Sequence, residues 1–408
     1  MLYHTDTKNK GEQIMKEIVI VAGVRTAVGR VGGTIARFRP EELGAFAIRG
    51  LVDKTGIDPN LIEDVVMGLS NSWHGAYNPS RWAVLKAGLP YSVPGVTVER
   101  QCSSGLQSIN FAATQILAGL GDIYIAGGME SWSQTPWMVP RASEAYSLTP
   151  PKFIVRETAP APEDQLVMGV TAENLVKKYN ITREEQDQMG YQSQIRAARA
   201  MKAGYFKDEI IPITVPQKKG DIVFDTDEHP RETSLDKLAA LPPAFIKNGT
   251  VTAGSSSGRN DGGAAVLVMT AEKARELGYT PLARWVTCGV AGVDPKIMGI
   301  GPAYAMPKAL KRAGLKMADM DVIELNEAFA AQVIACVKEL EAQGHTIDPE
   351  KLNPNGGAIA FGHPNGMSGT RIAIFAMNEM KRTGGRYAIC SLCIGGGQGL
   401  ATIFERMG

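Results

Sequence analysis

The sequence predicts an α/β fold, because apolar strands alternate along it with amphipathic helices. Early strands are expected at residues 17–22 and 64–68. Between them, residues 41–55 carry their apolar side chains at helical spacing. This alternation is typical of a mostly parallel sheet that helices cover. The last third repeats the pattern, with strands expected near residues 283–290, 321–325 and 386–390.

The first and last parts of the chain, which both show this alternation, also share a weak sequence similarity. Residues 96–99 run into Cys102 and then into a predicted helix that begins with small residues. Residues 386–392 run into Cys393 and then into a run of glycines. Two halves of similar plan, each presenting a cysteine, would be a duplicated α/β unit.

The composition changes between the two halves. From about residue 132 to residue 258 prolines cluster, charged helices intervene and strands are few, which predicts a large insertion. Core-like strand residues resume at residues 262–270. We therefore expect an N-terminal half of residues 17–131 and 260–281, an inserted loop domain of residues 132–259, and a C-terminal half of residues 282–408.

The first sixteen residues are polar and lack the apolar centre of a signal peptide. We interpret residues 1–16 as a disordered leader, or as the product of an upstream start codon ahead of a true start at Met15. The sequence contains no apolar run of the ~18 residues that a membrane-spanning helix needs.

The composition narrows the class of protein. Lys and Arg number 43 and Asp and Glu number 42, which argues against a general binder of nucleic acid or membrane surfaces. Five cysteines are too few, and odd in number, for a disulfide framework. A reducing compartment, the cytoplasm, is therefore the expected location.

Cys102 is the first candidate for chemistry. It stands at a predicted strand-to-helix corner, in Gln101-Cys102-Ser103-Ser104-Gly105. A helix N-terminus favours the thiolate, lowers the pKa of a cysteine there, and can hold an oxyanion on an acylated sulfur. The alternative is a buried cysteine that packs beneath the helix.

His363 and Asn326 are the next candidates. His363 lies in a glycine-rich loop fixed by Pro364, where an imidazole could activate a thiol, or could simply lie at the surface. Asn326 follows the apolar residues 322–325 and precedes a predicted helix. It could orient a water molecule in an active site, or cap the helix.

Two glycine-rich segments could approach a ligand. Cys393 begins the run Cys393-Ile-Gly-Gly-Gly, whose backbone N–H groups are open to a ligand. Cys390 and Cys393 also form a CxxC pattern, but without a second CxxC we expect no metal site and interpret Cys390 as a core residue. Residues 251–263 could lie along an extended ligand, or could be a flexible linker.

Taken together, these segments resemble the thiolase family over essentially the whole chain from about Ile18. Any one motif is weak, whereas five in this order are very unlikely to arise by chance. The motifs are Cys102-Ser-Ser-Gly, Ser257-Gly258-Arg-Asn-Asp-Gly, Asn326-Glu-Ala-Phe-Ala, Asn355-Gly-Gly through Gly362-His363-Pro364, and Cys393-Ile-Gly-Gly-Gly.

The resemblance implies a fold and catalytic roles. The fold would be two βαβαβαββ halves in a five-layered α-β-α-β-α sandwich, with a loop-domain insertion that binds coenzyme A. Cys102 would be the nucleophile, His363 its activator, and Cys393 the acid/base at the carbon nucleophile. Asn326 would fix a water in one oxyanion hole, and the N–H groups of Cys102 and Gly395 would form another.

The resemblance also implies contacts to substrate. Coenzyme A would be a substrate, with no bound cofactor and no metal. The expected partners are acyl-CoA and CoA, in a homodimer or homotetramer. Some family members also work with an accessory subunit. The residues expected to contact CoA or line the acyl pocket are Ser257, Gly258, Ala253, Phe245, Met168, Met298 and Phe329.

Two motif positions depart from the usual family pattern. Short-chain acetoacetyl-specific members usually carry a histidine just before the Met-Gly that precedes Thr-Ala-Glu-Asn, where this chain has Val167. After His-Pro the family usually has an aliphatic residue, where this chain has Asn365. The first departure weakens an acetoacetyl-CoA assignment.

The chain is also unusually aromatic in residues 72–82, and Trp132 and Trp137 add to this near the insertion. We therefore expect a non-standard acyl substrate, which could be bulky, aromatic or carboxylated. The alternative is that these aromatic side chains fill the core or a subunit interface.

Three functions are consistent with these sequence features. The first is an active thiolase, cleaving 3-ketoacyl-CoA or making acetoacetyl-CoA. The second is a decarboxylating ketoacyl synthase, which the second cysteine, Cys393, argues against. The third is a non-catalytic acyl-CoA- or lipid-binding protein, or a subunit that needs a partner. The intact set of Cys102, His363, Asn326 and Cys393 argues against lost activity.

Overall fold

The computed structural model describes residues 16–72, 75–142, 144 and 150–407. Most of the predicted leader, residues 1–15, lies outside this description, as do Trp73 and His74 of the aromatic segment. Each predicted strand and helix is found close to its expected place, with its ends shifted by a few residues.

The main strands form one continuous sheet path. They are β1 Ile18–Thr26, β3 Asp64–Gly68, β4 Val96–Val98, β5 Ile123–Ser131, β9 Asn260–Thr270, β10 Ala283–Gly292, β11 Val322–Leu325, β12 Tyr387–Ile394 and β13 Gln398–Arg406. Their order is β4-β3-β5-β9-β1-β10-β13-β12-β11. Two register pairs between β1 and β10 join the sheets of the two halves.

The prediction of a mostly parallel sheet is wrong. Along this path β3 runs parallel to β4 and β5, and β11 to β12. The pairs β5–β9, β9–β1, β1–β10, β10–β13 and β13–β12 are antiparallel. Strand–helix alternation indicates parallel neighbours only where a helix connects two strands. β13, which was not predicted from the sequence, instead follows β12 through a tight glycine turn.

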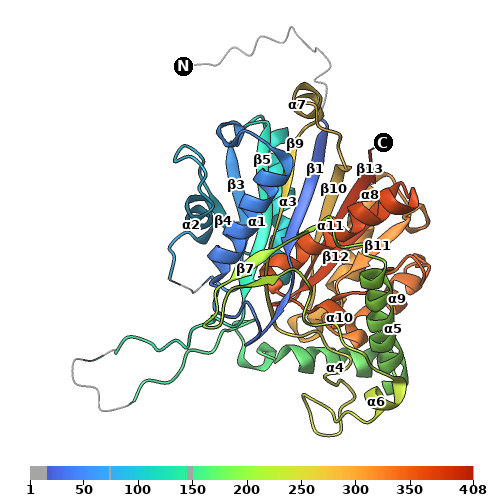
Figure 1. Ribbon diagram of the computed structural model, residues 1–408. Helices are drawn as coiled ribbons and strands as arrows, with labels where there is room; N and C mark the ends of the chain where they lie inside the picture. The colour runs from blue at the N-terminus through green and yellow to red at the C-terminus, as the bar shows by residue number, and fades with distance from the viewer. Residues whose placement is uncertain (1–15, 73–74, 143, 145–149, 408) are drawn as a thin grey trace, which may run out of the picture.

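The five-layered sandwich that the resemblance implied is confirmed. One outer layer of helices contains α1 Pro40–Thr55, α2 Pro79–Lys86 and α7 Ala271–Glu276. The central layer contains α3 Ser104–Leu117 and α11 Asn365–Thr383. The other outer layer contains α8 Gly301–Ala313 and α9 Ala330–Ala342. Three clusters of buried apolar residues fill the spaces between helices and sheets. α3 and α11 pack against each other and share one buried cluster with strands of both halves, near the centre of the molecule in Figure 1.

The two halves repeat the same order of strands and helices, but Cys393 does not stand at the position equivalent to Cys102. The order β1-α1-β3-α2-β4-α3-β5-β9 matches β10-α8-β11-α9-α11-β12-β13. An isolated bridge from Ile323 to Leu352 stands where the second half lacks a full strand. The counterpart of β12 is therefore β5, and the counterpart of α3 is α11. The residue equivalent to Cys102 thus precedes α11, which makes it His363 rather than Cys393.

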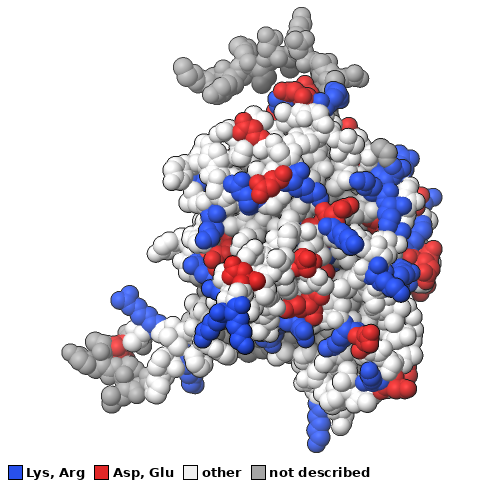
Figure 2. Space-filling model, viewed as in Figure 1, with Lys and Arg blue, Asp and Glu red and all other residues white. Residues whose placement is uncertain are grey.

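The residues between β5 and β9 lie outside this repeat. They contain α4 Met168–Tyr179, α5 Arg183–Lys202, α6 Leu235–Ala239 and the short strands β6 Ile210–Ile211, β7 Ile213–Val215 and β8 Ile222–Phe224. Their first part, drawn in teal, projects from the body as an arm (Figure 1). Acidic and basic side chains are interspersed over the face in Figure 2. Within the described residues, no helix is long and apolar enough to cross a membrane.

Candidate active site

The site residues come from both halves and meet where several elements begin or end. β11 and β12 are parallel, so their carboxyl ends lie at one edge of the sheet, with Asn326 beyond β11 and Cys393 near the end of β12. The Asn326 backbone N–H donates to the Ser391 carbonyl at 2.9 Å. Cys102 and His363 stand just before the two central helices. The fold thereby places four residues, scattered along the sequence, around one region.

The central helices bring Cys102 close to the His363 loop because their first turns contain glycine. A Cβ added at Gly105 would lie 2.7 Å from the Gly366 carbonyl oxygen and 3.0 Å from the Thr370 nitrogen. The Thr370 hydroxyl donates to the Gly105 carbonyl at 3.1 Å. Any larger side chain at Gly105 would push α11 away.

Cys102 lies in a short helical turn, Gln101–Ser103, directly ahead of α3. Gln101 holds a left-handed φ of 43°, an uncommon conformation that a non-glycine residue keeps where the surroundings impose it. The prediction of a lowered thiol pKa is wrong for the free protein. Burial raises the pKa of the Cys102 thiol to about 11, although N–H donors from Asn365 and Gly395 act in the opposite direction.

His363 is held so that one ring nitrogen is available as a base. Its Nδ1 lies 2.7 Å from the Ser368 hydroxyl, which itself donates to the Pro364 carbonyl at 3.0 Å. The hydroxyl must therefore accept from Nδ1–H, which leaves the lone pair on Nε2. Burial lowers the pKa of His363 to about 3, and the nearby Arg371 adds to the effect. The ring is neutral at physiological pH and can take up a proton.

Asn326 faces Nε2 of the His363 ring. Its Nδ2 lies 3.4 Å from His363 Nε2, and its side-chain oxygen is buried without a protein partner among the described residues. Asn326 does not cap the following helix, because α9 begins at Ala330 with Phe329 as its N-cap. The helix-cap alternative for Asn326 is therefore wrong.

Cys393 lies near enough to Cys102 for their charges to interact, and its side chain packs away from that of Cys390. Burial raises the pKa of the Cys393 thiol well above its usual value, and a negative charge on Cys102 would raise it further. Cys390 packs in the cluster beneath α11 and Cys393 in the cluster beneath α8 and α9, so the two sulfurs lie on opposite faces of β12. Across the described residues, no group of three or more metal-ligating side chains is placed to hold an ion.

Most of the expected acyl and CoA contacts gather beside this site. The rings of Phe245 and Phe329 meet edge to face at 5.8 Å, and Phe329 shares its buried cluster with Met298 and Cys393. A Cβ on Gly395 would lie 4.0 Å from the sulfur of Met168.

The loop that precedes β9 also reaches this region. Ser257 N–H donates to the Ala328 carbonyl, and the Gly258 carbonyl accepts from His363 N–H. Ala253 is exposed, and its recorded contact is to Arg231 instead. The structure therefore brings six of the seven predicted contact residues toward the site.

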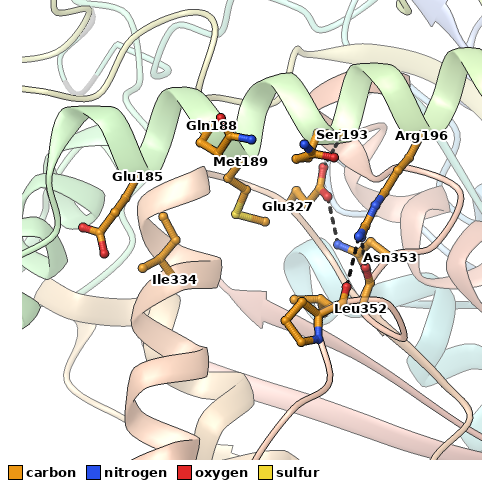
Figure 3. A pocket seen from close by; sticks show the side chains of 11 residues that line it. Glu185, Gln188, Met189, Ser193, Arg196, Glu327, Ile334, Leu352 and Asn353 are labelled. Atoms are coloured by element: carbon orange, nitrogen blue, oxygen red, sulfur yellow. Dashed lines mark hydrogen bonds between the residues drawn. The ribbon is translucent and has the colours of Figure 1, made fainter. Parts of the chain in front are cut away.

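A cavity of about 340 Å³ lies on the other side of the Asn326 loop, between α5, α9 and residues 349–353 (Figure 3). Its wall includes the buried Glu327 carboxylate, which accepts from Ser193 at 2.6 Å, Asn353 at 2.9 Å and the Ile359 N–H at 3.2 Å. Glu327 thereby ties the Asn326 loop to the segment that leads to His363. Neither Cys102 nor His363 lines this cavity.

Several residues that support the site were not predicted from the sequence. Asn260 accepts from the His363 backbone N–H at 3.0 Å, and the buried Glu130 accepts from Gly366 N–H at 3.0 Å. A charged residue within the apolar strand β5 was the available signal for Glu130. Asn365, noted only as a departure from the family pattern, donates from Nδ2 to the Cys102 sulfur at 3.1 Å.

The aromatic segment gives little support to a special acyl pocket. Tyr77 is fully exposed, Trp82 lies on the outer helix α2 beneath Arg39, and Trp137 is 84% exposed on the projecting arm. Of the aromatic residues that motivated that expectation, Trp132 reaches the site: its indole N–H donates to Asn365 Oδ1 at 2.9 Å.

Comparisons with known proteins agree with this geometry. Residues 18–272 match the thiolase N-terminal domain and residues 279–406 the thiolase C-terminal domain. An acetyl-CoA acetyltransferase of Chromobacterium violaceum is 47% identical over 96% of this chain and 100% of that protein. A 3-oxoadipyl-CoA/3-oxo-5,6-dehydrosuberyl-CoA thiolase of Escherichia coli is 45% identical over the same shares.

A solved structure extends the similarity to the fold. The crystal structure of an acetyl-CoA acetyltransferase of Bacillus anthracis superposes with a TM-score of 0.91 at 43% identity, covering 96% of this chain and 99% of that one. The chain belongs to the thiolase family and is an acyltransferase.

Proposed function

We propose that this protein catalyses the reversible, CoA-dependent cleavage of a 3-ketoacyl-CoA to acetyl-CoA, or another acyl-CoA, and a shortened acyl-CoA. One observation carries the proposal: Cys102, Cys393 and the Asn326–His363 pair, from distant parts of the sequence, lie in one buried region. A thiol nucleophile, a neutral imidazole base and a second thiol are the groups that such a cleavage needs.

In the first half-reaction His363 Nε2 takes the proton of Cys102, and the thiolate attacks the 3-keto carbon. The bond between C2 and C3 breaks, and the acyl group stays on Cys102 as a thioester. The carbanion of the departing acetyl-CoA takes the proton of the Cys393 thiol. His363 is then protonated and Cys393 is a thiolate, so the charges balance.

The second half-reaction restores both groups. Cys393 takes the proton of an incoming CoA thiol, whose sulfur attacks the acyl carbon. The bond from that carbon to Cys102 Sγ breaks, and the released thiolate regains its proton from His363. The N–H groups of Cys102 and Gly395, which both act to lower the pKa of the Cys102 thiol, would hold the oxyanion that develops on the acyl oxygen. Each such donor typically lowers a barrier by about 3 kcal/mol.

Asn326 and the apolar wall complete the assignment. The buried oxygen of Asn326, which has no hydrogen-bond partner among the described residues, suits a water molecule that would serve, with His363, the oxyanion of the attacking acetyl-CoA. Met298 and Phe329 would line the acyl pocket. Met168, Phe245, Ala253, Ser257 and Gly258 would contact CoA.

We further propose that the preferred acyl group is not plain acetoacetyl. Val167, where acetoacetyl-specific members usually carry histidine, and the amide of Asn365 beside Cys102 support this. The name of the Escherichia coli relative points to a carboxylated acyl chain as the first candidate to test. Steady-state rates on acetoacetyl-CoA, a long-chain 3-ketoacyl-CoA, an aryl 3-ketoacyl-CoA and 3-oxoadipyl-CoA decide the matter. Acetoacetyl-CoA as the best substrate by far would contradict it.

Mass spectrometry of the intact protein tests the mechanism. After incubation with candidate acyl-CoAs, we expect an acyl adduct on Cys102 whose mass names the substrate. In Cys393→Ala, acyl-CoA should still load Cys102, though more slowly, because a CoA thiolate can leave without the proton that Cys393 would give it, whereas a carbanion cannot. Carbon–carbon cleavage should fall by about 10²–10⁴-fold, as for loss of a general acid. Absence of any adduct on Cys102 with every substrate would refute the proposal.

A further inference from the structure

The side chain of Asn365 makes two directed contacts at the reacting sulfur. Its Nδ2 donates to Cys102 Sγ at 3.1 Å, and its Oδ1 accepts from the indole Nε1 of Trp132 at 2.9 Å. Asn365 is the first residue of α11, and Trp132 immediately follows β5. An aliphatic side chain at position 365 could make neither contact.

The indole determines which end of the amide faces the sulfur. An indole N–H can only donate, so the atom of Asn365 that meets it must be the carbonyl oxygen. The NH₂ group is then turned toward Cys102, where a thiolate can only accept. In the flipped amide, oxygen would face the thiolate and two donors would face each other. Trp132 thus removes the ambiguity that an asparagine side chain otherwise has.

Trp132 is itself held in place from its other side. The guanidinium carbon of Arg259 lies 5.3 Å from the centre of the indole ring, at the distance of a cation–π contact. The residue that follows Trp132, Ser133, is fixed by a hydrogen bond from its backbone N–H to Asp261 at 3.0 Å. The indole is therefore anchored through Arg259, which directly precedes β9, and through Asp261 within β9.

We propose that Asn365 is a catalytic residue that stabilises the Cys102 thiolate through a hydrogen bond, and that Trp132 is the positioning residue that keeps its amide in the donating orientation. A hydrogen bond to sulfur is stronger for the thiolate than for a thioester. The contact therefore favours the charge that forms when Cys102 attacks, and again when it leaves the acyl group. The inference rests on the proposed role of Cys102 as nucleophile.

The test measures the alkylation of Cys102 by iodoacetamide in the full chain, a reaction that needs no acyl transfer. The rate is followed on the Cys102 peptide by mass spectrometry across pH, because only the thiolate reacts. For Asn365→Leu we expect a rate at about pH 8 roughly tenfold lower, the effect of one hydrogen bond to a charged group. Asn365→Asp keeps the shape and loses the donor, so we expect an equal or larger decrease.

Trp132→Phe removes the indole N–H but keeps a ring, and we expect a smaller decrease in the same direction. The chain offers a matched control. Trp285 Nε1 donates to Asn110 Oδ1 at 2.8 Å, the same pair of groups, but Asn110 Nδ2 donates to the Thr402 hydroxyl at 2.9 Å instead of a thiol. Trp285→Phe should leave the alkylation rate of Cys102 unchanged.

Wild-type rates in both Asn365 variants would overturn the inference, as would an equal decrease in Trp285→Phe and Trp132→Phe. A steric role for position 365 predicts that Asn365→Asp behaves as wild type and only Asn365→Leu slows. If Asn365→Leu fails to fold, Asn365→Asp and Trp132→Phe carry the test. Failure of the proposed function would appear separately, as wild-type protein that alkylates at Cys102 but takes up no acyl group.

Discussion

The corners ahead of the two central helices are equivalent in the repeat but carry different chemistry. Ahead of α3 stands Cys102, preceded by Gln101 at a φ of 43°, and ahead of α11 stands His363, preceded by Gly362 at a φ of 86°. In each corner a glycine follows three residues later, where the helices meet. The duplicated backbone thus brings two positions together, and on the proposed mechanism the thiol at one is the nucleophile and the imidazole at the other is the base.

The residues at the two corners, Cys102 and His363, are also both uncharged near neutral pH. Burial raises the pKa of Cys102 to about 11 and lowers that of His363 to about 3, so both groups are neutral over a wide pH range. Many cysteine enzymes instead keep a thiolate beside an imidazolium. On the proposed mechanism the proton would move only when substrate is attacked, and the donors around Cys102 would stabilise a charge that exists briefly.

The largest effect is expected at the N-terminal corner. Cys102→Ala removes the atom that carries the acyl group, so turnover should fall by on the order of 10⁶-fold, as when other covalent enzymes lose their nucleophile. No acyl adduct should form at any residue, as judged by mass spectrometry. Adduct on another cysteine of this variant would show that the two corners do not divide the roles as proposed.

The C-terminal corner should matter less. His363→Asn keeps a polar side chain but loses the base, and acyl loading should slow by about 10²–10⁴-fold. Because hydroxide can take the thiol proton instead, the deficit relative to wild type should shrink as pH rises. Single-turnover acylation followed at several pH values measures this. A deficit that is the same at every pH would assign His363 to holding an oxyanion rather than to removing the proton.

Only part of the fold and of the two corners could be predicted from the sequence. Helical and strand spacing predicted α1, α3 and most strands, because each of those signals is local. Strand direction, β13 and the equivalence of Cys102 with His363 depend on long-range pairing and could not be read from spacing. Similarly, the helix-start argument for Cys102 omitted burial, which dominates its pKa. Asn365 was visible only as a departure from a pattern, since its partners Trp132 and Cys102 are more than 230 residues away.

Substitutions at Gly105 and Gly366 test whether both corners depend on the close approach of their helix to its neighbours. A Cβ at Gly105 would lie 2.7 Å from the Gly366 carbonyl, and one at Gly366 would collide with the backbone near Leu69 and Met129. Each Gly→Ala change should therefore lower the free energy of unfolding by about 1–3 kcal/mol. Gly292→Ala is the control, because its Cβ would meet nothing within 4 Å. Urea unfolding that leaves either corner variant as stable as this control would show that its helix can shift freely.

The smallest effect concerns the resting charge of Cys102. With a thiol pKa near 11, the thiolate is a minor species at neutral pH, and its share rises about tenfold for each pH unit. Alkylation of wild-type Cys102 by iodoacetamide should therefore keep rising between about pH 6 and pH 9 without a plateau. A plateau near neutrality would mean that Cys102 and His363 rest as an ion pair. Cys102 would then carry a negative charge and His363 a positive charge before substrate binds. Asn365 would stabilise a permanent thiolate instead of a transient one.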